Sequence, residues 1–344
     1  MSMIIRQGGF LTTVQDLGRF GRQKFGVMVS GPMDETAFVT ANLLLGNERG
    51  EAMFEMTLLG PEILFEEAAT IALTGAKMQG TLNGFPVPAY RAVMVPAGST
   101  LKLSGCSEGV RAYLAVAGGL AIPEVMGSAS TLLRASFGGY EGRKLMAGDR
   151  IELKEPGKVL SGLSARRTAD LVLLGGKKRG TETIRVIIGP QEERFTERGL
   201  ETFLSAVYEV SQEADRMGYR LEGEKIEHVT DGNIITDGIA AGSIQVPSAG
   251  LPIIMMADRQ CTGGYAKIAT VISVDLPKVS QKKPGEKLRF AAVSVQEAQR
   301  LIKEREAHYQ ALERQIAAAV GAEISYHLTV DGRTYVVEIE PIEE

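Results

Sequence analysis

The stretch that decides the fold runs from residue 62 to residue 119 and reads "EILFEEAATIALTGAKMQGTLNGFPVPAYRAVMVPAGSTLKLSGCSEGVRAYLAVAGG". Short apolar runs recur through it, and Gly, Pro or Asn separates each run from the next. Runs this short and this often interrupted predict β-strands joined by tight turns. We therefore expect a β-barrel or a β-sandwich in this part of the chain.

The same pattern returns after a hydrophilic segment, from residue 184 to residue 290. Each of the two regions also contains a helical pattern, at residues 35–46 and 197–206, and Asp34 is a suitable N-cap for the first. The regions end on similar stretches, "AGDRIELKE" and "PGEKLRFAA". This shared order favours two related β-rich domains over one large domain.

The remaining residues form a different third part. "VSVQEAQRLIKEREAHYQALERQIAAAV" (293–320) predicts a long helix, with Ser294 and Glu297 in the spacing of a capping box. A hairpin with an Asp-Gly turn at 331–332 follows it. We expect a mainly β fold with some α-helix, divided as domain 1–155, linker 156–183, domain 184–292 and C-terminal helix with hairpin 293–344.

Composition excludes several classes of protein. The chain has 344 residues, of which 44% are hydrophobic and 23% charged, and its net charge is −4. These values are typical of a soluble globular protein and disfavour binding to nucleic acid or to a membrane surface. The N-terminus lacks the pattern of a signal peptide, so we expect a cytoplasmic protein. Two distant cysteines and three scattered histidines predict no metal site.

No local motif assigns a reaction to the chain. The G-x-S-x-G elbow, the P-loop and the G-x-G-x-x-G turn are all missing from the sequence. Cys261 would need a general base to act as a nucleophile, and no histidine lies in a motif that suggests such a pairing. The catalytic residues are therefore unknown, and the chain is either part of an active site or a binding protein.

Six polar segments instead place Asp, Arg, Gln, Ser or Thr among glycines and prolines; one of them is "DRQCTGGY" (258–265). Each segment alone is as well explained as a β-turn stabilised by side-chain hydrogen bonds. Six in one chain favour convergence on a small polar or anionic ligand, which Arg216 or Arg259 would hold by its carboxylate and Gln245 or Gln260 by an amide. The candidate ligand-binding residues are Arg19, Asp34, Asp215, Arg216, Gln245, Asp258, Arg259, Gln260 and Thr262.

Long stretches of the chain resemble the biotin-dependent carboxyltransferase-like family, which includes KipA, the C component of 5-oxoprolinase and allophanate hydrolase subunit 2. The resemblance covers about residues 13–290 and includes "TVQDLGRFG", "GSASTLLRASFGGYEGR" and "ADRMGYRLEG". Two positions depart from the family pattern: Cys261 stands where Thr is usual, and Ala214 where Ser is usual. The first departure argues against a catalytic thiol.

The resemblance implies two cyclophilin-like β-barrels and a heteromeric complex. With a KipI-like B component and an A component of 5-oxoprolinase, the complex would use ATP to open the lactam of 5-oxo-L-proline and release L-glutamate. An alternative is half of a biotin-dependent carboxyltransferase that acts on urea or a related amide, with biotin carried by a partner. A third is a KipA-type antagonist that binds a KipI-like kinase inhibitor without catalysis.

Overall fold

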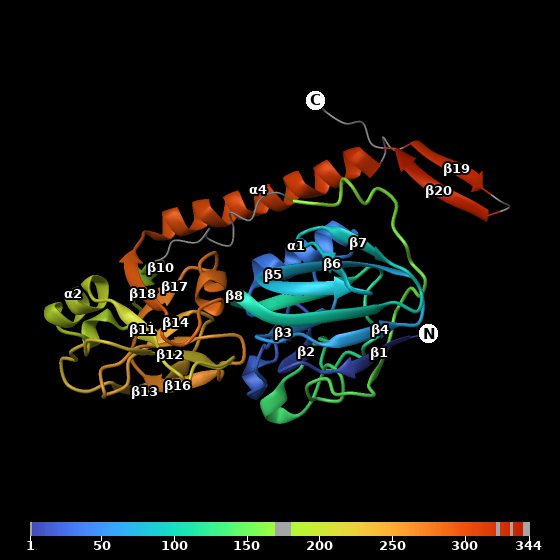
Figure 1. The fold of residues 1–344 in the computed structure, drawn as a ribbon. Helices are drawn as coiled ribbons and strands as arrows, with labels where there is room; N and C mark the ends of the chain where they lie inside the picture. Colours follow the sequence, from blue (N-terminus) through green and yellow to red (C-terminus); the bar gives the residue numbers. More distant parts are fainter. Residues whose placement is uncertain (1, 169–179, 321–323, 331–332, 340–344) are drawn as a thin grey trace.

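Two β-rich bodies lie side by side, and one long helix runs along both of them (Figure 1). The computed structural model describes residues 2–168, 180–320, 324–330 and 333–339, and the side chains of residues 2–168 and 180–318. Within these ranges no helix is both long and apolar enough to cross a membrane. Part of the predicted linker, residues 169–179, and the predicted turn at 331–332 lie outside the described residues.

The first body is a nine-stranded sheet. Its main path runs in the order β2-β3-β8-β4-β1-β9, and β5 adds β6 and β7 by pairing with both and with β8. The strands are β1 (Ser2–Gln7), β2 (Leu11–Gln15), β3 (Met53–Thr57), β4 (Glu62–Phe65), β5 (Ala69–Leu82), β6 (Phe85–Val87), β7 (Ala92–Val95), β8 (Thr100–Val116) and β9 (Arg150–Glu152).

The predicted short strands between residues 70 and 119 are in part wrong, because four of them merge into the two long strands β5 and β8. The glycines interpreted as turns sit inside these strands. Gly75 has φ +86°, and a Cβ there would lie 2.5 Å from the carbonyl oxygen of Arg111. The register of the β5–β8 pair shifts just after it, between Gly75 and Lys77. The glycine thus bends a strand that continues.

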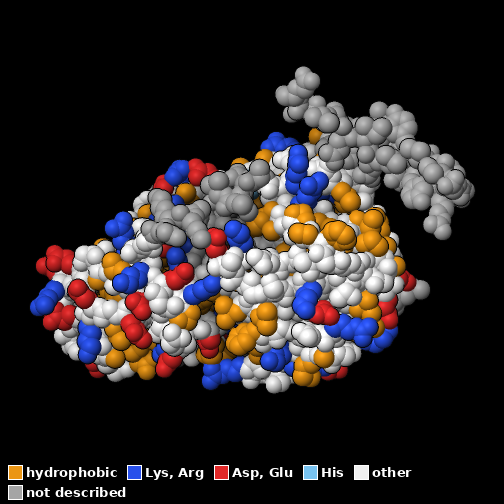
Figure 2. All heavy atoms as spheres, in the orientation of Figure 1, with side chains coloured by type: hydrophobic (Ala, Val, Ile, Leu, Met, Phe, Trp, Pro, Cys, Tyr) orange, Lys and Arg blue, Asp and Glu red, His pale blue; other side chains and the backbone are white. Residues whose placement is uncertain are grey.

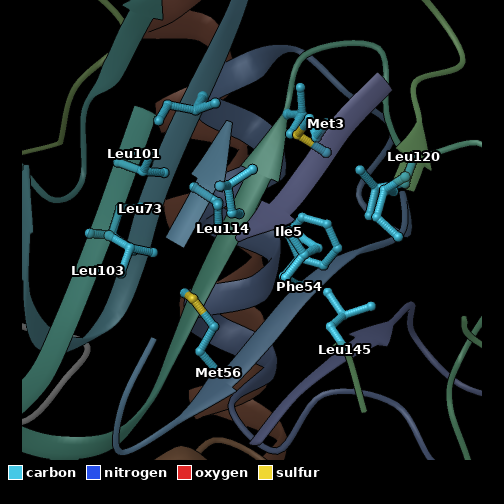
Figure 3. Packing of buried hydrophobic residues seen from close by; sticks show 14 of the residues in the cluster. Met3, Ile5, Phe54, Met56, Leu73, Leu101, Leu103, Leu114, Leu120 and Leu145 are labelled. Atoms are coloured by element: carbon cyan, nitrogen blue, oxygen red, sulfur yellow. The ribbon is translucent and has the colours of Figure 1, made fainter. Parts of the chain in front are cut away.

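Large apolar side chains from several strands of this sheet form one buried core. Leu73 on β5, Leu101 and Leu114 on β8 and Phe54 on β3 all point into one cluster with Ile5 of β1 (Figure 3). Each of these residues is almost completely buried. The short apolar runs of the sequence, which predicted β-strands, therefore supply the side chains of this core.

The second body is a closed barrel of seven strands in the order β10-β17-β14-β15-β12-β11-β18, with β18 pairing back onto β10. Two further strands, β13 (Asn233–Gly238) and β16 (Thr262–Tyr265), form a separate pair. The barrel strands are β10 (Glu182–Ile188), β11 (Tyr208–Val210), β12 (Gly218–Glu222), β14 (Ser243–Gln245), β15 (Ile253–Met255), β17 (Lys267–Val271) and β18 (Lys287–Ala292).

Short helices accompany both bodies, as the sequence predicts. Helix α1 (Glu35–Leu45) begins at Asp34, whose carboxylate accepts from the amide of Ala37 at 2.9 Å, and ends at Gly46. Helix α2 (Glu197–Ser205) covers the barrel, where Phe203 stacks on Phe290 of β18 at 4.5 Å between ring centroids. The short helix α3 (Leu276–Ser280) follows β17.

The long helix α4 (Val295–Val320) packs on α1 through Tyr309, Leu312 and Ile316, which share a buried cluster with Phe38 and Leu44. Beyond it, β19 (Ile324–Val330) and β20 (Arg333–Ile339) form an antiparallel hairpin that projects away from both bodies (Figure 1). The fold class is confirmed: mainly β, with a sheet, a closed barrel and a C-terminal helix. The domain boundaries at residues 155, 183 and 292 stay a prediction.

The surface in Figure 2 carries Lys, Arg, Asp and Glu side chains interspersed over the barrel. Hydrophobic side chains gather over the first body, where Phe85 and Met94 are exposed. Charges of mixed sign give this face no extended field of one sign, and such a field is what attracts a polyanion.

Candidate functional site

The segment Asp258–Gln260 leaves the barrel after β15 and before β16, at the junction of the two bodies. Its backbone is fixed by two hydrogen bonds: the Asp258 amide donates to the Arg216 carbonyl at 2.8 Å, and the Arg259 amide to the Met256 carbonyl at 3.2 Å. Three predicted site residues thus stand in a row on a turn that the barrel holds in place.

Arg216 holds a carboxylate in a bidentate manner, but the carboxylate belongs to Asp258. Its Nε lies 2.8 Å from Asp258 Oδ2 and its Nη2 lies 2.9 Å from Asp258 Oδ1. Nη1 donates to Glu55 on β3, and Nη2 also donates to the Gly31 carbonyl at 2.7 Å. Although burial disfavours its charge, Asp258 and Glu55 raise the pKa of Arg216 above its ordinary value. Every nitrogen of this guanidinium is therefore bound within the chain.

Asp34 belongs to a second polar cluster beside the first. Its Oδ2 accepts from Gln281 Nε2 at 2.8 Å, and its amide donates to the Tyr113 hydroxyl at 2.7 Å. Tyr113 in turn donates to Glu55 at 2.8 Å, which joins the two clusters. Burial raises the pKa of Asp34. This carboxylate caps helix α1 and links it to the loop after α3.

Arg259 is almost as buried as Arg216 but has different partners. Its Nε donates to the Ile239 carbonyl at 3.2 Å and its Nη1 to the Met256 carbonyl at 3.3 Å. Burial lowers the pKa of Arg259 below its ordinary value. The side chain lines a cavity of about 240 Å³ between the two bodies, which we call the junction cavity; its other lining residues include Leu17, Phe20, Ser30, Met33 and Met256.

Gln260, the next residue, lines a different and larger cavity of about 780 Å³. We call this the large cavity; its polar lining includes Arg134, Gln212, Asp215, Arg220, Gln245 and Gln260. Arg134 comes from the first body and the others from the barrel, so the large cavity also draws on both. Three of the predicted residues that are far apart in sequence, Asp215, Gln245 and Gln260, therefore line one cavity, and their role in ligand binding stays a prediction.

Within the large cavity the predicted residues are held differently. Gln245 is buried, and its Nε2 lies 3.4 Å from the Tyr265 carbonyl. Asp215 is exposed and accepts from the amides of Met217 at 2.8 Å and Gly218 at 3.1 Å, which is an Asx turn. The amides of Gln245 and Gln260 offer both donors and acceptors to a ligand.

Two more of the predicted residues, Arg19 and Thr262, contribute to the lining of neither cavity. Arg19 is fully buried in the first body, where it donates to the carbonyls of Val125, Ser128 and Ser130 and lies over the Phe137 ring. Thr262 is exposed on β16 and pairs with Gly238 of β13. Neither residue lines one of the two cavities, and their role in ligand binding stays a prediction.

Glu55, Ser30 and Gln281 belong to the same polar clusters but were not among the predicted site residues. Glu55 is buried and binds Arg216 and Tyr113. Ser30 has φ +61° and places its hydroxyl 2.6 Å from Asp258 Oδ1. A positive φ on a residue other than glycine is uncommon and suggests a constrained site. Of the three, only Ser30 lies in a polar segment of the sequence, "SGPMDETA" (30–37).

Cys261 takes no part in either cavity. Its backbone carbonyl accepts from the Ile239 amide at 3.0 Å, and its thiol is half-buried. His228 lies elsewhere, 3.0 Å from the Val246 carbonyl and against the Phe195 ring. His228 is therefore held by other groups and is not a partner of the Cys261 thiol.

Comparison with known proteins identifies the family. The carboxyltransferase domain, described as subdomain A and B, matches residues 25–292. The chain is 36% identical to the C component of the 5-oxoprolinase of Escherichia coli over 312 residues, which cover 91% of this chain and 97% of the relative. It is also 36% identical to the C component of the 5-oxoprolinase of Haemophilus influenzae over 302 residues, covering 88% and 94%.

Solved structures agree with this assignment. The crystal structure of the K. lactis urea amidolyase superimposes with a TM-score of 0.83 at 30% identity. The superimposed region covers 90% of this chain but only 20% of the urea amidolyase chain. The fold, the matched residues and these relatives together show that the chain belongs to the carboxyltransferase-domain family, as its sequence motifs indicate.

Proposed function

We propose that the chain is the C component of an ATP-dependent 5-oxoprolinase, which opens 5-oxo-L-proline to L-glutamate together with a KipI-like B component and an A component. The observation that carries this proposal is the match in length: the relatives named as this 5-oxoprolinase component align over almost their whole length. The urea amidolyase chain, in contrast, is matched over one fifth. ATP-dependent lactam opening also fits a cytoplasmic location.

The large cavity supplies groups that suit a lactam. A lactam has one carbonyl acceptor and one N–H donor, and the amides of Gln245 and Gln260 provide the complementary donors and acceptors. Transfer of the ATP γ-phosphate to the lactam oxygen would release ADP and make the ring carbon a better electrophile. Two waters would then complete hydrolysis to L-glutamate and phosphate. Arg134 at this cavity is suited to offset phosphate charge, whereas Arg220 is paired with Glu213.

Reconstitution tests the proposal. The chain is mixed with purified A and B components, ATP and 5-oxo-L-proline, and glutamate and ADP are measured. We expect both products in a ratio of one to one, and none when any of the three proteins is omitted. Stoichiometric binding of the KipI-like component without any turnover would overturn the proposal in favour of a KipA-type antagonist.

A pair of variants tests the role of the large cavity. Gln245→Leu removes a buried amide that lines it, and we expect turnover by the complex to fall by about tenfold to a hundredfold. Gln212→Leu changes an exposed amide at the edge of the same cavity and should leave turnover within about twofold. Size-exclusion chromatography should show an intact complex with both variants. Equal effects of the two variants would remove Gln245 from the proposed site.

A second candidate is half of a biotin-dependent carboxyltransferase, which the structural match to the K. lactis urea amidolyase favours. In this case a partner would carry the biotin. The test supplies carboxybiotin on a carrier protein and urea, and measures urea-dependent loss of the carboxyl group. Transfer in this assay, together with no lactam opening by the reconstituted complex, would select this candidate.

A further inference from the structure

The junction cavity is distinct from the large cavity although the two share one segment of chain. It lies between the loop that precedes α1 in the first body and two barrel segments, residues 256–259 and 273–277. Most of its lining is apolar, with Leu17, Val29, Met33, Met256 and Leu276 among the contributors. At about 240 Å³ it is below the size range of about 300–1,000 Å³ that is typical of sites for drug-sized ligands. It therefore suits a small molecule with an apolar body.

Arg259 is the positively charged group in this lining. The residue is only 8% exposed, and its guanidinium donates to two neutral carbonyl oxygens, those of Ile239 and Met256. Arg216, in the same junction, binds two carboxylates. A buried guanidinium that has only neutral acceptors is costly to desolvate, and an anion beside it lowers that cost.

The acidic groups near this cavity already have partners of their own. Asp258 is bound by Arg216 and by the Ser30 hydroxyl. Glu35, which also lines the cavity, forms an ion pair with Arg305 of α4 at 3.3 Å. Their charges are therefore largely offset, and Arg259 has capacity to bind an anion from solution.

We propose that the junction cavity binds a small monocarboxylate, whose carboxylate accepts from Arg259 and whose apolar body contacts Met33 and Met256. A phosphate group would need several donors to offset its charge, and the apolar lining offers few. A single guanidinium matches the planar, singly charged carboxylate in geometry and in charge. The inference goes beyond the proposed function, because it does not depend on the reaction that the complex performs.

Methionine methyl groups allow a direct test on the full chain. With ¹³C-labelled methionine methyls, Met33 and Met256 report on the junction cavity, while Met217 and Met255 report on the large cavity. The probes are propionate and butyrate, each compared with its neutral analogue, propionamide and butyramide. We expect the two carboxylates to shift the Met33 and Met256 signals in a saturable manner, at least about tenfold more tightly than their neutral analogues.

Two variants and one control test which groups bind the carboxylate. Arg259→Met should weaken carboxylate binding by at least about tenfold and abolish the preference over the neutral analogue. Arg220→Met, at the large cavity, is the matched control and should leave binding unchanged. Arg259→Met is a change in the protein interior that can impair folding, so Ala241→Leu serves as a second variant. Ala241 lines the junction cavity and is exposed, and the larger leucine side chain should block binding.

Three outcomes would overturn the inference. The first is a shift of the Met217 and Met255 signals alone, which would place the anion in the large cavity. The second is equal affinity for a carboxylate and its neutral analogue. The third is unchanged binding in a folded Ala241→Leu protein. A reconstituted complex without lactam-opening activity would contradict the proposed function only, since propionate binding is measured independently.

Discussion

The guanidinium of Arg216, on the turn before β12, donates to the buried carboxylate of Glu55 on β3 and so ties the barrel to the first sheet. The same guanidinium binds Asp258, so one cation offsets two buried anions. Removing one partner of such a group leaves the other charges in the protein interior without compensation, which is far more costly than loss of a surface pair.

Arg216→Met should therefore lower the free energy of unfolding by about 3–5 kcal/mol. Urea-induced unfolding followed by circular dichroism measures this change. Arg220→Met is the control, because Arg220 pairs with Glu213 while their side chains are 55% and 76% exposed. We expect at most about 1 kcal/mol for this control. Similar losses for the two variants would contradict the importance of the buried cluster.

Asp275 gives the stability a dependence on acid. The Asp275 carboxylate accepts two hydrogen bonds from the Arg185 guanidinium, at 2.6 Å and 2.9 Å, and one from the Arg185 amide, at 2.9 Å. Although burial opposes ionisation of Asp275, these bonds hold its pKa below the ordinary value. A lowered pKa in the folded state means that the stabilisation is present above the unfolded pKa of about 3.9 and is lost as the pH falls through the folded pKa.

Asp275→Asn should therefore cost about 2 kcal/mol at neutral pH, with the difference from the unchanged protein narrowing below about pH 4. Urea unfolding at a series of pH values measures both effects. A difference that stays constant down to about pH 2 would show that the carboxylate does not titrate in this way.

Helix α4 should stabilise the fold through the side chains that it buries against α1. Leu312→Ala should lower the free energy of unfolding by about 2–4 kcal/mol, because Leu312 is almost completely buried. Ile302, on the same helix, is 40% exposed, and Ile302→Ala should cost less than about 1 kcal/mol. Urea unfolding of both variants measures the two losses. A small loss for Leu312→Ala would mean that the helix is only loosely attached.

Cys261→Thr should change neither activity nor stability to a measurable degree. Cys261 is not among the residues that line either cavity, and the resemblance to the family places Thr at this position. We expect turnover of the reconstituted complex within about twofold and a free energy of unfolding within about 0.5 kcal/mol of the unchanged protein. Loss of turnover in Cys261→Thr would restore a chemical role for the thiol.

Local features of the fold were predictable from the sequence. Asp34 and Gly46 mark the ends of α1 because capping depends only on neighbouring residues. The strands β5 and β8 were located correctly but divided wrongly, because a glycine that bends a strand and a glycine that ends one look alike in sequence. Strand pairing over long distances decides between the two.

The site was predictable only in part for a similar reason. Glu55 alternates with Phe54 and Met56 along β3, which is the pattern of a strand with one face toward solvent. Helix α1, the loop before it and the barrel cover that face, so the glutamate is buried and pairs with Arg216. Likewise, nothing local distinguishes Arg216, which is bound on all sides, from Arg259, which lines a cavity. Contacts between the two bodies make that difference.

The charges shared by Glu55, Arg216 and Asp258 also bear on how the chain unfolds. Separation of the barrel from the sheet would bring all three groups into water at once and would break the hydrogen bond from Gln281 to Asp34 beside them. Neither body can therefore melt far ahead of the other without a large loss on its partner. We therefore expect the two bodies to unfold as one cooperative unit, so that a calorimetric scan records a single endotherm whose van't Hoff and measured enthalpies agree.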